Sequence, residues 1–315
     1  MPARRVAAID CGTNSIRLLI ADLFPERSQV TDVVRLMEIV RLGEGVDKTG
    51  RLAETAIERT IAALRGYADL IREHGAQAVR MVATSASRDA ENSADFTQRV
   101  KEVLGVEPEV VSGDEEAALS FTGATRELTE GYESPFLVTD IGGGSTEFVA
   151  GVPSSTVPST TDGHISVNIG CVRLTERYLH GDPPLAEEIA ITTGSIDDVL
   201  AQVAASVPMT EAKTLVGLAG SVTTIAGIAL DLDRYDSERI HHSRIPAARV
   251  HEIAERLLAQ TRAQRAAIPV MHPGRVDVIG GGALILDRIM TRFGFADVLV
   301  SEHDILDGIA WSLVE

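Results

Sequence analysis

The chain has 315 residues, of which 44% are hydrophobic, so it is long enough for about two domains with apolar cores and unlike a disordered protein. Its 29 basic and 46 acidic residues give a net charge of −17, which disfavours nucleic acid and anionic membranes as partners. Only two cysteines occur, Cys11 and Cys171, and neither belongs to a Cys-x-x-Cys pair. With no signal-peptide core and no apolar run long enough to span a membrane, we expect a cytoplasmic protein with reduced cysteines.

The first motif in chain order is an apolar run, a polar glycine-containing turn and a second apolar run, which together predict a β-hairpin at residues 6–20. The same pattern returns at residues 136–150 with matching offsets. The matching positions are Asp10, Gly12 and Ser15 in the first hairpin and Asp140, Gly142 and Ser145 in the second. The match predicts two related domains; the alternative is a chance similarity of two glycine-rich hairpins.

Strand-like and helix-like segments alternate along the rest of the chain. Apolar residues at helical spacing predict helices at residues 53–73, 92–105 and 250–263, and another helix is expected from Asp114. A final helix is expected at about 304–313. The β-branched run at 79–83 predicts a strand followed by a polar loop at 84–88. Residues 214–224 and 276–282 each predict a strand, a glycine turn and a helix start, whereas 151–163 predicts a polar loop.

The glycine turns suit phosphate chemistry. Consecutive glycines expose backbone N–H groups to an anion without obstruction by Cβ atoms. An aspartate at the strand end just before such a turn suits Mg²⁺, which prefers oxygen ligands and bridges to phosphate. A single glycine turn is more commonly only a turn, but four in one chain favour a phosphate site.

Three motifs in this order resemble the exopolyphosphatase and guanosine pentaphosphate phosphatase (Ppx/GppA) family: Asp10-x-Gly-Thr-Asn-Ser, Ser112-Gly-x-Glu-Glu116-Ala and Asp140-Ile-Gly-Gly-Gly-Ser-Thr-Glu147. The duplicated hairpins are shared with sugar kinases, heat-shock ATPases and actin, and the middle motif narrows the resemblance to this family. Further matches are Gly170-Cys-Val-Arg-Leu-Thr175 and Gly220-Ser221-Val-Thr223.

The resemblance implies an α/β fold of two actin-like (ribonuclease H-like) domains, each with a mixed five-stranded sheet flanked by helices, around an interdomain cleft. We expect the first domain at residues 1–120 and the second at 121–301. A final helix at about 302–315 is expected to pack on the first domain, as in relatives. A homodimer is also consistent with the family.

The resemblance also implies roles for particular residues. Glu116 would orient or deprotonate the attacking water, although a glutamate in the first turn of a helix can simply be solvated, as we expect for Glu115. Arg88 would clamp phosphate; its alternative is a surface ion pair with Asp89 or Glu91. The residues expected to bind the phosphoryl group are Gly12, Thr13, Asn14, Ser15, Gly142, Gly143, Gly144 and Ser145.

Asp140 and Glu147 are the candidate Mg²⁺ ligands, because offsets across a tight hairpin bring them close together; alternatively Glu147 is an exposed strand residue. Arg17 stands at the offset that Glu147 occupies in the second hairpin, and this difference suggests that metal is held asymmetrically. Arg17 is a weaker candidate for binding neighbouring phosphates. The other weaker candidates for the site are Asp10, Gly220 and Ser221.

Two regions depart from the family pattern or lie outside it. Leu306 stands where the family commonly has the Arg of a Leu-Arg-Glu-Gly segment, so no role of that Arg is carried over. His241, His242 and Arg244 form a small basic cluster that could attract a polyanion. Because adjacent residues face different ways on a helix or a strand, we interpret the two histidines as surface residues and a poor metal site.

We therefore expect a Mg²⁺-dependent exopolyphosphatase that releases orthophosphate from the end of inorganic polyphosphate by direct attack of water. Short chains are the expected substrate, because the protein is acidic and ends at Glu315 without the C-terminal module of larger relatives. The main alternative is hydrolysis of guanosine pentaphosphate. A second alternative is a nucleotide-binding regulator of the same superfamily without phosphatase activity.

Overall fold

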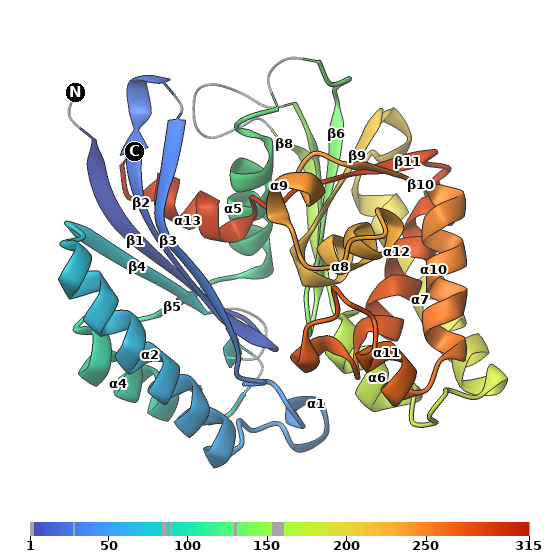
Figure 1. Cartoon of the computed structure of the whole chain (residues 1–315), viewed down its shortest axis with the longest axis horizontal. Coiled ribbons are helices and arrows are strands. Elements are labelled where there is room, and N and C mark those ends of the chain that lie inside the picture. The colour runs from blue at the N-terminus through green and yellow to red at the C-terminus, as the bar shows by residue number, and fades with distance from the viewer. Residues whose placement is uncertain are drawn as a thin grey trace. The chain divides into compact units, whose positions relative to one another are not determined.

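The computed structural model describes residues 3–27, 29–83, 87–88, 90–128, 131–152 and 161–314. The predicted loop residues 84–86, Asp89 and most of the predicted polar loop at 151–163 lie outside this part of the chain. The described residues form two compact units (Figure 1): the first contains 3–127 and 304–314, and the second contains 128–152 and 161–303.

The first unit is built on a five-stranded mixed sheet in the order β3-β2-β1-β4-β5. Strands β1, β2 and β3 are antiparallel neighbours, and β1, β4 and β5 run parallel. The strands are β1 (Arg4–Cys11), β2 (Ser15–Phe24), β3 (Gln29–Ile39), β4 (Ala78–Ala83) and β5 (Glu109–Val110). The helices are α1 (Val46–Thr49), α2 (Glu54–His74), α4 (Ser93–Leu104), α5 (Gly113–Thr125) and α13 (Ile305–Ser312), with a 3₁₀ turn η1 (Pro25–Arg27).

Side chains of β1 alternate between the two faces of this sheet. Ile9 and Cys11 enter the core beneath α2 and α4, whereas Val6 and Ala8 enter the core that contains α13. In Figure 1, α2 and α4 cover one face of the sheet, and α5 and α13 cover the other. Asp10 has the same parity as Ala8, so it lies on the face that α5 and α13 cover.

The predicted helices of the first unit are present. Gly75 and Gly105 end α2 and α4 in the left-handed conformation that glycine adopts most easily. Asn92 precedes α4 as expected, but its side chain does not cap the helix. Its Oδ1 instead accepts a bond from the Leu52 N–H, and its Nδ2 donates to the Leu52 carbonyl, so the amide joins two segments.

The second unit is built on a sheet in the order β10-β11-β9-β6-β7-β8. The strands are β6 (Phe136–Ile141), β7 (Thr146–Gly151), β8 (Thr161–Val167), β9 (Thr214–Leu218), β10 (Arg244–Pro246) and β11 (Asp297–Val300). The helices are α6 (Cys171–Tyr178), α7 (Ala186–Ser206), α8 (Ala219–Ala229), α9 (Ser237–Ile240), α10 (Ala247–Ala259), α11 (Arg262–Ala266) and α12 (Ile279–Phe293), with 3₁₀ turns η2 (Met209–Glu211) and η3 (Pro273–Arg275). Five strands were expected; the sixth, β10, is a three-residue edge strand paired with β11.

One predicted element of the second unit is wrong. The apolar residues from Val276 were expected to form a strand before a glycine turn, but they form a turn that leads directly into α12. Gly280, Gly281 and Gly282 lie inside that helix and are buried. A Cβ at Gly281 would meet the Cys171 carbonyl at 3.1 Å, so the small residues let α12 pack closely on α6. A short apolar run fits a buried strand or a buried helix equally well, which is why the pattern misled.

The helix expected at 250–263 is α10, and it ends at Ala259. Gln260 is extended, and Thr261 then starts α11 with a capping box in which Thr261 and Gln264 bond reciprocally. Among the helices described, none combines the length and the hydropathy needed to cross a membrane.

Candidate active site

The two hairpins predicted from the sequence share their turn geometry. In each turn the first glycine donates a backbone bond to the serine three residues later: Gly12 N to Ser15 O and Gly142 N to Ser145 O, both at 3.0 Å. The strand register is also the same, because Asp10 lies opposite Arg17 and Asp140 lies opposite Glu147. The duplication therefore extends from the motif to the backbone.

The turn of the second hairpin presents a row of backbone N–H groups. The carbonyls of Gly142 and Gly143 accept bonds from the first backbone N–H groups of α6, and Arg173 Nε donates to the Gly144 carbonyl at 2.7 Å. Because the N–H of a trans peptide points opposite to its C=O, the N–H groups of Gly143, Gly144 and Ser145 face away from α6. Such a row of outward N–H groups forms an anion-binding nest.

The first turn is held in a similar way. Its Thr13 carbonyl accepts from Gly43 N at 2.8 Å, and its Asn14 carbonyl accepts from Arg41 N at 2.9 Å. The segment after β3 therefore supports the turn that contains the predicted phosphate-binding residues of this unit.

A pair of buried carboxylates follows the second turn. Asp140 at the end of β6 is 7% exposed, and Glu147 directly opposite on β7 is 2% exposed. Directly opposed side chains of antiparallel strands lie on the same face of a sheet. The Glu147 Oε1 accepts a bond from the Ser166 hydroxyl of β8 at 2.7 Å. Glu147 is therefore not the exposed strand residue of the alternative interpretation.

At the matching place in the first unit, the pair is an aspartate and an arginine. Arg17 donates from Nε and Nη2 to the Asp10 Oδ2, at 2.9 and 2.6 Å, and from Nη1 to Asp304, the residue that caps α13. Asp10 is 5% exposed. This guanidinium thus contacts two carboxylates, and the predicted contact of Arg17 with phosphate stays a prediction.

Arg88 and Glu116 come together at the carboxyl edge of the parallel strands β1, β4 and β5. Arg88 follows β4, and Glu116 lies in the first turns of α5, whose N-terminus is capped by the Ser112 hydroxyl. Arg88 Nη1 donates to Glu116 Oε2 at 3.2 Å and to the Val111 carbonyl at 3.1 Å. Both hydrogen bonds of Arg88 within the described chain use Nη1, which leaves Nε and Nη2 for an anion.

The neighbouring glutamates behave differently. Glu116 is only 8% exposed, whereas Glu115 is exposed and accepts a bond from Arg80 at 2.8 Å. Glu91, an alternative partner of Arg88, instead pairs with Arg51 at 3.4 Å. The other alternative, Asp89, lies outside the described residues.

Two buried polar atoms at the ends of β1 and β4 have no hydrogen-bond partner among the described residues. They are Asp10 Oδ1 at the end of β1 and the Ser87 hydroxyl after β4. Because β1 and β4 are parallel neighbours, both atoms belong to the edge that also carries Arg88 and Glu116. Buried polar groups without a partner are uncommon, and here they mark a place where a bound group can supply one.

Gly220 and Ser221 begin α8 after β9, the strand beside β6, so they share an edge with Asp140. Ala219 just before them has φ +67°, a strained value for a residue with a Cβ. The guanidinium of Arg275 lies against Gly220 where a Cβ would stand, and it donates to the Thr224 hydroxyl at 3.3 Å. Arg275 thus adds a cation at this edge.

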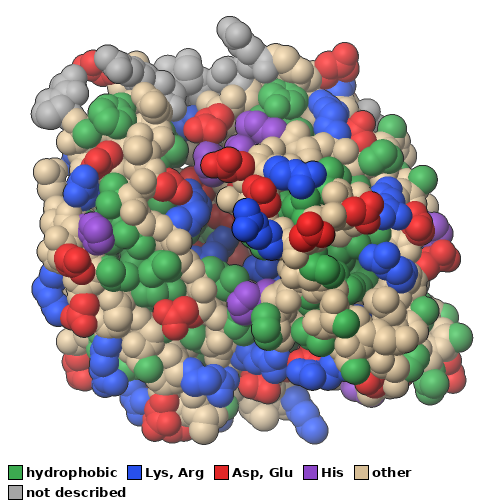
Figure 2. All heavy atoms as spheres, in the orientation of Figure 1, with side chains coloured by type: hydrophobic (Ala, Val, Ile, Leu, Met, Phe, Trp, Pro, Cys, Tyr) green, Lys and Arg blue, Asp and Glu red, His purple; other side chains and the backbone are tan. Residues whose placement is uncertain are grey.

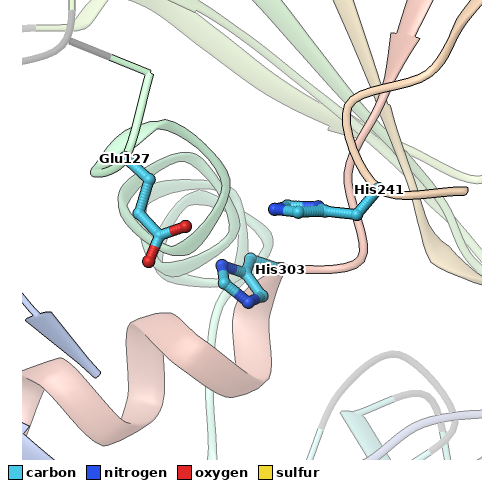
Figure 3. A group of neighbouring side chains, drawn as sticks. All are labelled: Glu127, His241 and His303. Atoms are coloured by element: carbon cyan, nitrogen blue, oxygen red, sulfur yellow. The ribbon is translucent and has the colours of Figure 1, made fainter. Parts of the chain in front are cut away.

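The histidine cluster of the second unit differs from the prediction. The rings of His241 and His242 stack with centroids 3.7 Å apart, although adjacent side chains were expected to face different ways. The two residues lie between α9 and β10, outside regular structure, and His242 has φ +59°. Figure 3 shows His241 beside His303, with ring centroids 4.6 Å apart. The Glu302 N–H donates to His241 Nδ1 at 3.1 Å. Neither histidine is fully exposed.

The departure at Leu306 has a structural explanation. Leu306 is 1% exposed and packs in the apolar core around α13 with Val82 and Val111. A guanidinium at this position would need a polar partner inside that core.

Four residues of this arrangement were missed by sequence reasoning: Ser87, Ser166, Arg275 and Asp304. Ser166 lies opposite Glu147 in the strand register, and Asp304 meets Arg17 only because α13 packs on β1 and β2. Asp304 precedes the last helix as a recognisable cap, but its partner lies 287 residues away in sequence. No local pattern gives such a pairing.

Carboxylate oxygens are the ligands that Mg²⁺ prefers, and the buried pair Asp140 and Glu147 fits that ion.

Lys and Arg side chains are interspersed with Asp and Glu over the face shown in Figure 2. Any anion binding would therefore have to rely on local groups, and the described residues offer the turn N–H groups, Arg88 and Arg275.

The duplicated turns, the buried carboxylate pair and the Arg88–Glu116 pair define an α/β protein of two related units whose strand ends carry groups suited to phosphate. The Ppx/GppA phosphatase family matches residues 21–315, and the chain belongs to this family. It is 49% identical to exopolyphosphatase 2 of Mycobacterium tuberculosis over 99% of both chains. Among solved structures, it is similar to an exopolyphosphatase-like protein (40% identity, TM-score 0.92, 98% of both chains). It also resembles the Aquifex aeolicus family member (30% identity, TM-score 0.82, 99% of this chain and 98% of that chain). The predicted family is confirmed, and so is the predicted α/β fold of two mixed sheets flanked by helices.

Proposed function

We propose that the protein is an exopolyphosphatase, which removes orthophosphate from the end of inorganic polyphosphate. The observation that carries this proposal is the buried Glu116, held by Arg88 at the carboxyl edge of the parallel strands. A buried carboxylate at a phosphate site is the group that hydrolysis of a phosphoanhydride needs to orient and deprotonate water. The name of the M. tuberculosis relative supports the choice of polyphosphate.

In the proposed reaction, a water oxygen attacks the terminal phosphorus while its proton passes to Glu116. The anhydride P–O bond breaks, and its electron pair stays on the oxygen of the shortened chain. Arg88 Nε and Nη2 bind phosphoryl oxygens and stabilise the charge that develops on them. The N–H groups of Gly143, Gly144 and Ser145 bind further phosphate oxygens and fix the orientation of the chain.

Asp140 and Glu147 would hold Mg²⁺, with Ser166 fixing the Glu147 carboxylate through its hydrogen bond. When bound, Mg²⁺ neutralises charge on phosphate oxygens that would otherwise repel the attacking water. The remaining predicted residues, Gly12 to Ser15, Gly220 and Ser221, would bind phosphate through backbone N–H and hydroxyl groups.

The two cysteines are buried and form no disulfide, which is consistent with a protein that functions in the reducing cytoplasm.

The test is orthophosphate release from polyphosphates of several lengths and from guanosine pentaphosphate. The wild type should act on polyphosphate, and Glu116→Gln should lower the rate by at least about 1000-fold, because the amide cannot accept the proton. Glu115→Gln is the matched control: it changes the exposed neighbour in the same way and should keep at least half of the rate. Release of orthophosphate from guanosine pentaphosphate alone would identify the protein as a guanosine pentaphosphate phosphatase instead. Release from neither substrate would favour a nucleotide-binding regulator without phosphatase activity.

A further inference from the structure

The two hairpins differ most at one register position. In the second hairpin, Glu147 adds a carboxylate beside Asp140; in the first, Arg17 places a guanidinium beside Asp10. Arg17 uses Nε and Nη2 on the same oxygen, Oδ2, at 2.9 and 2.6 Å. The other oxygen, Oδ1, is the buried atom without a partner among the described residues. Oδ2 of Asp10 is thus fixed by Arg17, whereas Oδ1 can still accept a hydrogen bond or bind a cation.

The charge on Asp10 depends on this arrangement. Burial raises the pKa of the Asp10 carboxyl, Arg17 opposes that rise, and the nearby carboxylate of Asp304 adds to it. An ionised carboxylate that is only 5% exposed needs an opposite charge and hydrogen bonds to persist. Among the described residues, Arg17 is the cation that hydrogen-bonds to Asp10.

A second carboxylate fixes the guanidinium itself. Asp304 is 3% exposed, accepts from Arg17 Nη1, and caps α13 by accepting from the Leu306 N–H at 3.0 Å. The Arg17 guanidinium is therefore held between the end of β1 and the start of α13. Its orientation is fixed by these two carboxylates.

We infer that Arg17 is a positioning residue, which, anchored by Asp304, holds Asp10 so that Oδ1 faces the reacting groups. This inference rests on the proposed function, since Asp10 shares its edge with Arg88 and Glu116. It assigns Arg17 a role through Asp10 in place of direct contact with phosphate. The two roles differ in their kinetics: positioning affects mainly kcat, whereas a phosphate contact affects mainly KM.

The first test is a double-mutant cycle on polyphosphate hydrolysis. Arg17→Met should lower kcat about tenfold or more with KM within about twofold of the wild type, because small errors in position are costly in catalysis. In an Asp10→Asn background, the same change should lower kcat by less than about twofold, since the group through which Arg17 acts is already altered. Arg17→Lys, which keeps the charge with fewer donors, should restore part of the lost kcat.

Arg35 provides the matched control. It joins β3 to the same helix by donating to Asp307 at 2.6 Å, and its other partner among the described residues is Asp32 rather than Asp10. Arg35→Met should lower the melting temperature about as much as Arg17→Met and leave kcat within about twofold. Asp304→Asn keeps an acceptor for the helix cap and removes the charge that anchors Arg17, so it should lower kcat in the same direction as Arg17→Met.

Each other outcome has a defined meaning. An equal loss of kcat in Arg35→Met would show that docking of α13, rather than the position of Asp10, matters. A rise in KM alone, or the same loss in both backgrounds of the cycle, would overturn the positioning role and return Arg17 to phosphate binding or structure. If Asp10→Asn has no measurable rate, the comparison of Arg17→Met, Asp304→Asn and Arg35→Met decides. Absence of phosphate release by the wild type would instead refute the proposed function.

Discussion

At the residue scale, the same register position carries opposite charges in the two hairpins, so the two units are suited to different partners. Asp140 with Glu147 makes a dicarboxylate suited to a cation, whereas Asp10 with Arg17 is electrically balanced. The sequence predicted that Asp140 and Glu147 lie close together, because a seven-residue offset across a tight turn is local, whereas for Arg17 it favoured a contact with phosphate. It could not predict Ser166 or Asp304 as their further partners, because those contacts depend on how the sheet and α13 pack.

The two cysteines give a prediction that depends on pKa. Burial raises the pKa of Cys11 and of Cys171 above that of an ordinary thiol. A raised pKa means that less of the reactive thiolate is present at pH 8, and burial also blocks the reagent. Both thiols of the native protein should therefore resist a thiol reagent at pH 8, and both should react within minutes after unfolding in denaturant. Rapid labelling of Cys171 in the native protein would contradict the described environment.

At the scale of elements, the sequence pattern did not predict where two helices pack closely against each other. The last helix was expected within a residue or two of its observed position, but the sequence did not indicate that Gly308 of α13 lies against the Leu119 carbonyl of α5. The misassigned strand at Val276 has the same origin, since glycines that seemed to form a turn instead allow α12 to approach its neighbours. Helix propensity is a local property, whereas the distance between two helices is not.

Substitution at these glycines tests the packing. Gly308→Ala should lower the free energy of unfolding by about 1–3 kcal/mol, because the added methyl group meets backbone atoms that cannot move easily. The control is Gly66→Ala in α2, where a Cβ has nothing within 4 Å. It should raise the free energy of unfolding by about 0.5–1 kcal/mol through helix propensity. Denaturant unfolding followed by circular dichroism compares the two; equal effects would mean that α13 does not pack closely on α5.

At the scale of the whole molecule, the duplicated hairpins were enough to predict two related units, and the three motifs together were enough to predict the family. The short sixth strand β10 was not foreseen, because three residues carry no usable alternation. With a net charge of −17, the proposed polyanionic substrate would have to be attracted by a few groups at strand ends rather than by the protein as a whole. Loss of a single one of these groups at the strand ends should therefore lower the turnover rate strongly.

The most direct measurement is phosphorus NMR of a polyphosphate of one defined length during digestion with Mg²⁺. The proposed function predicts that the orthophosphate signal grows from the start, that internal phosphate signals decline while terminal signals persist, and that Glu116→Gln or a chelator stops both changes. Growth of terminal signals without orthophosphate would reveal cleavage within the chain, and an undiminished rate in Glu116→Gln would show that another group activates the water.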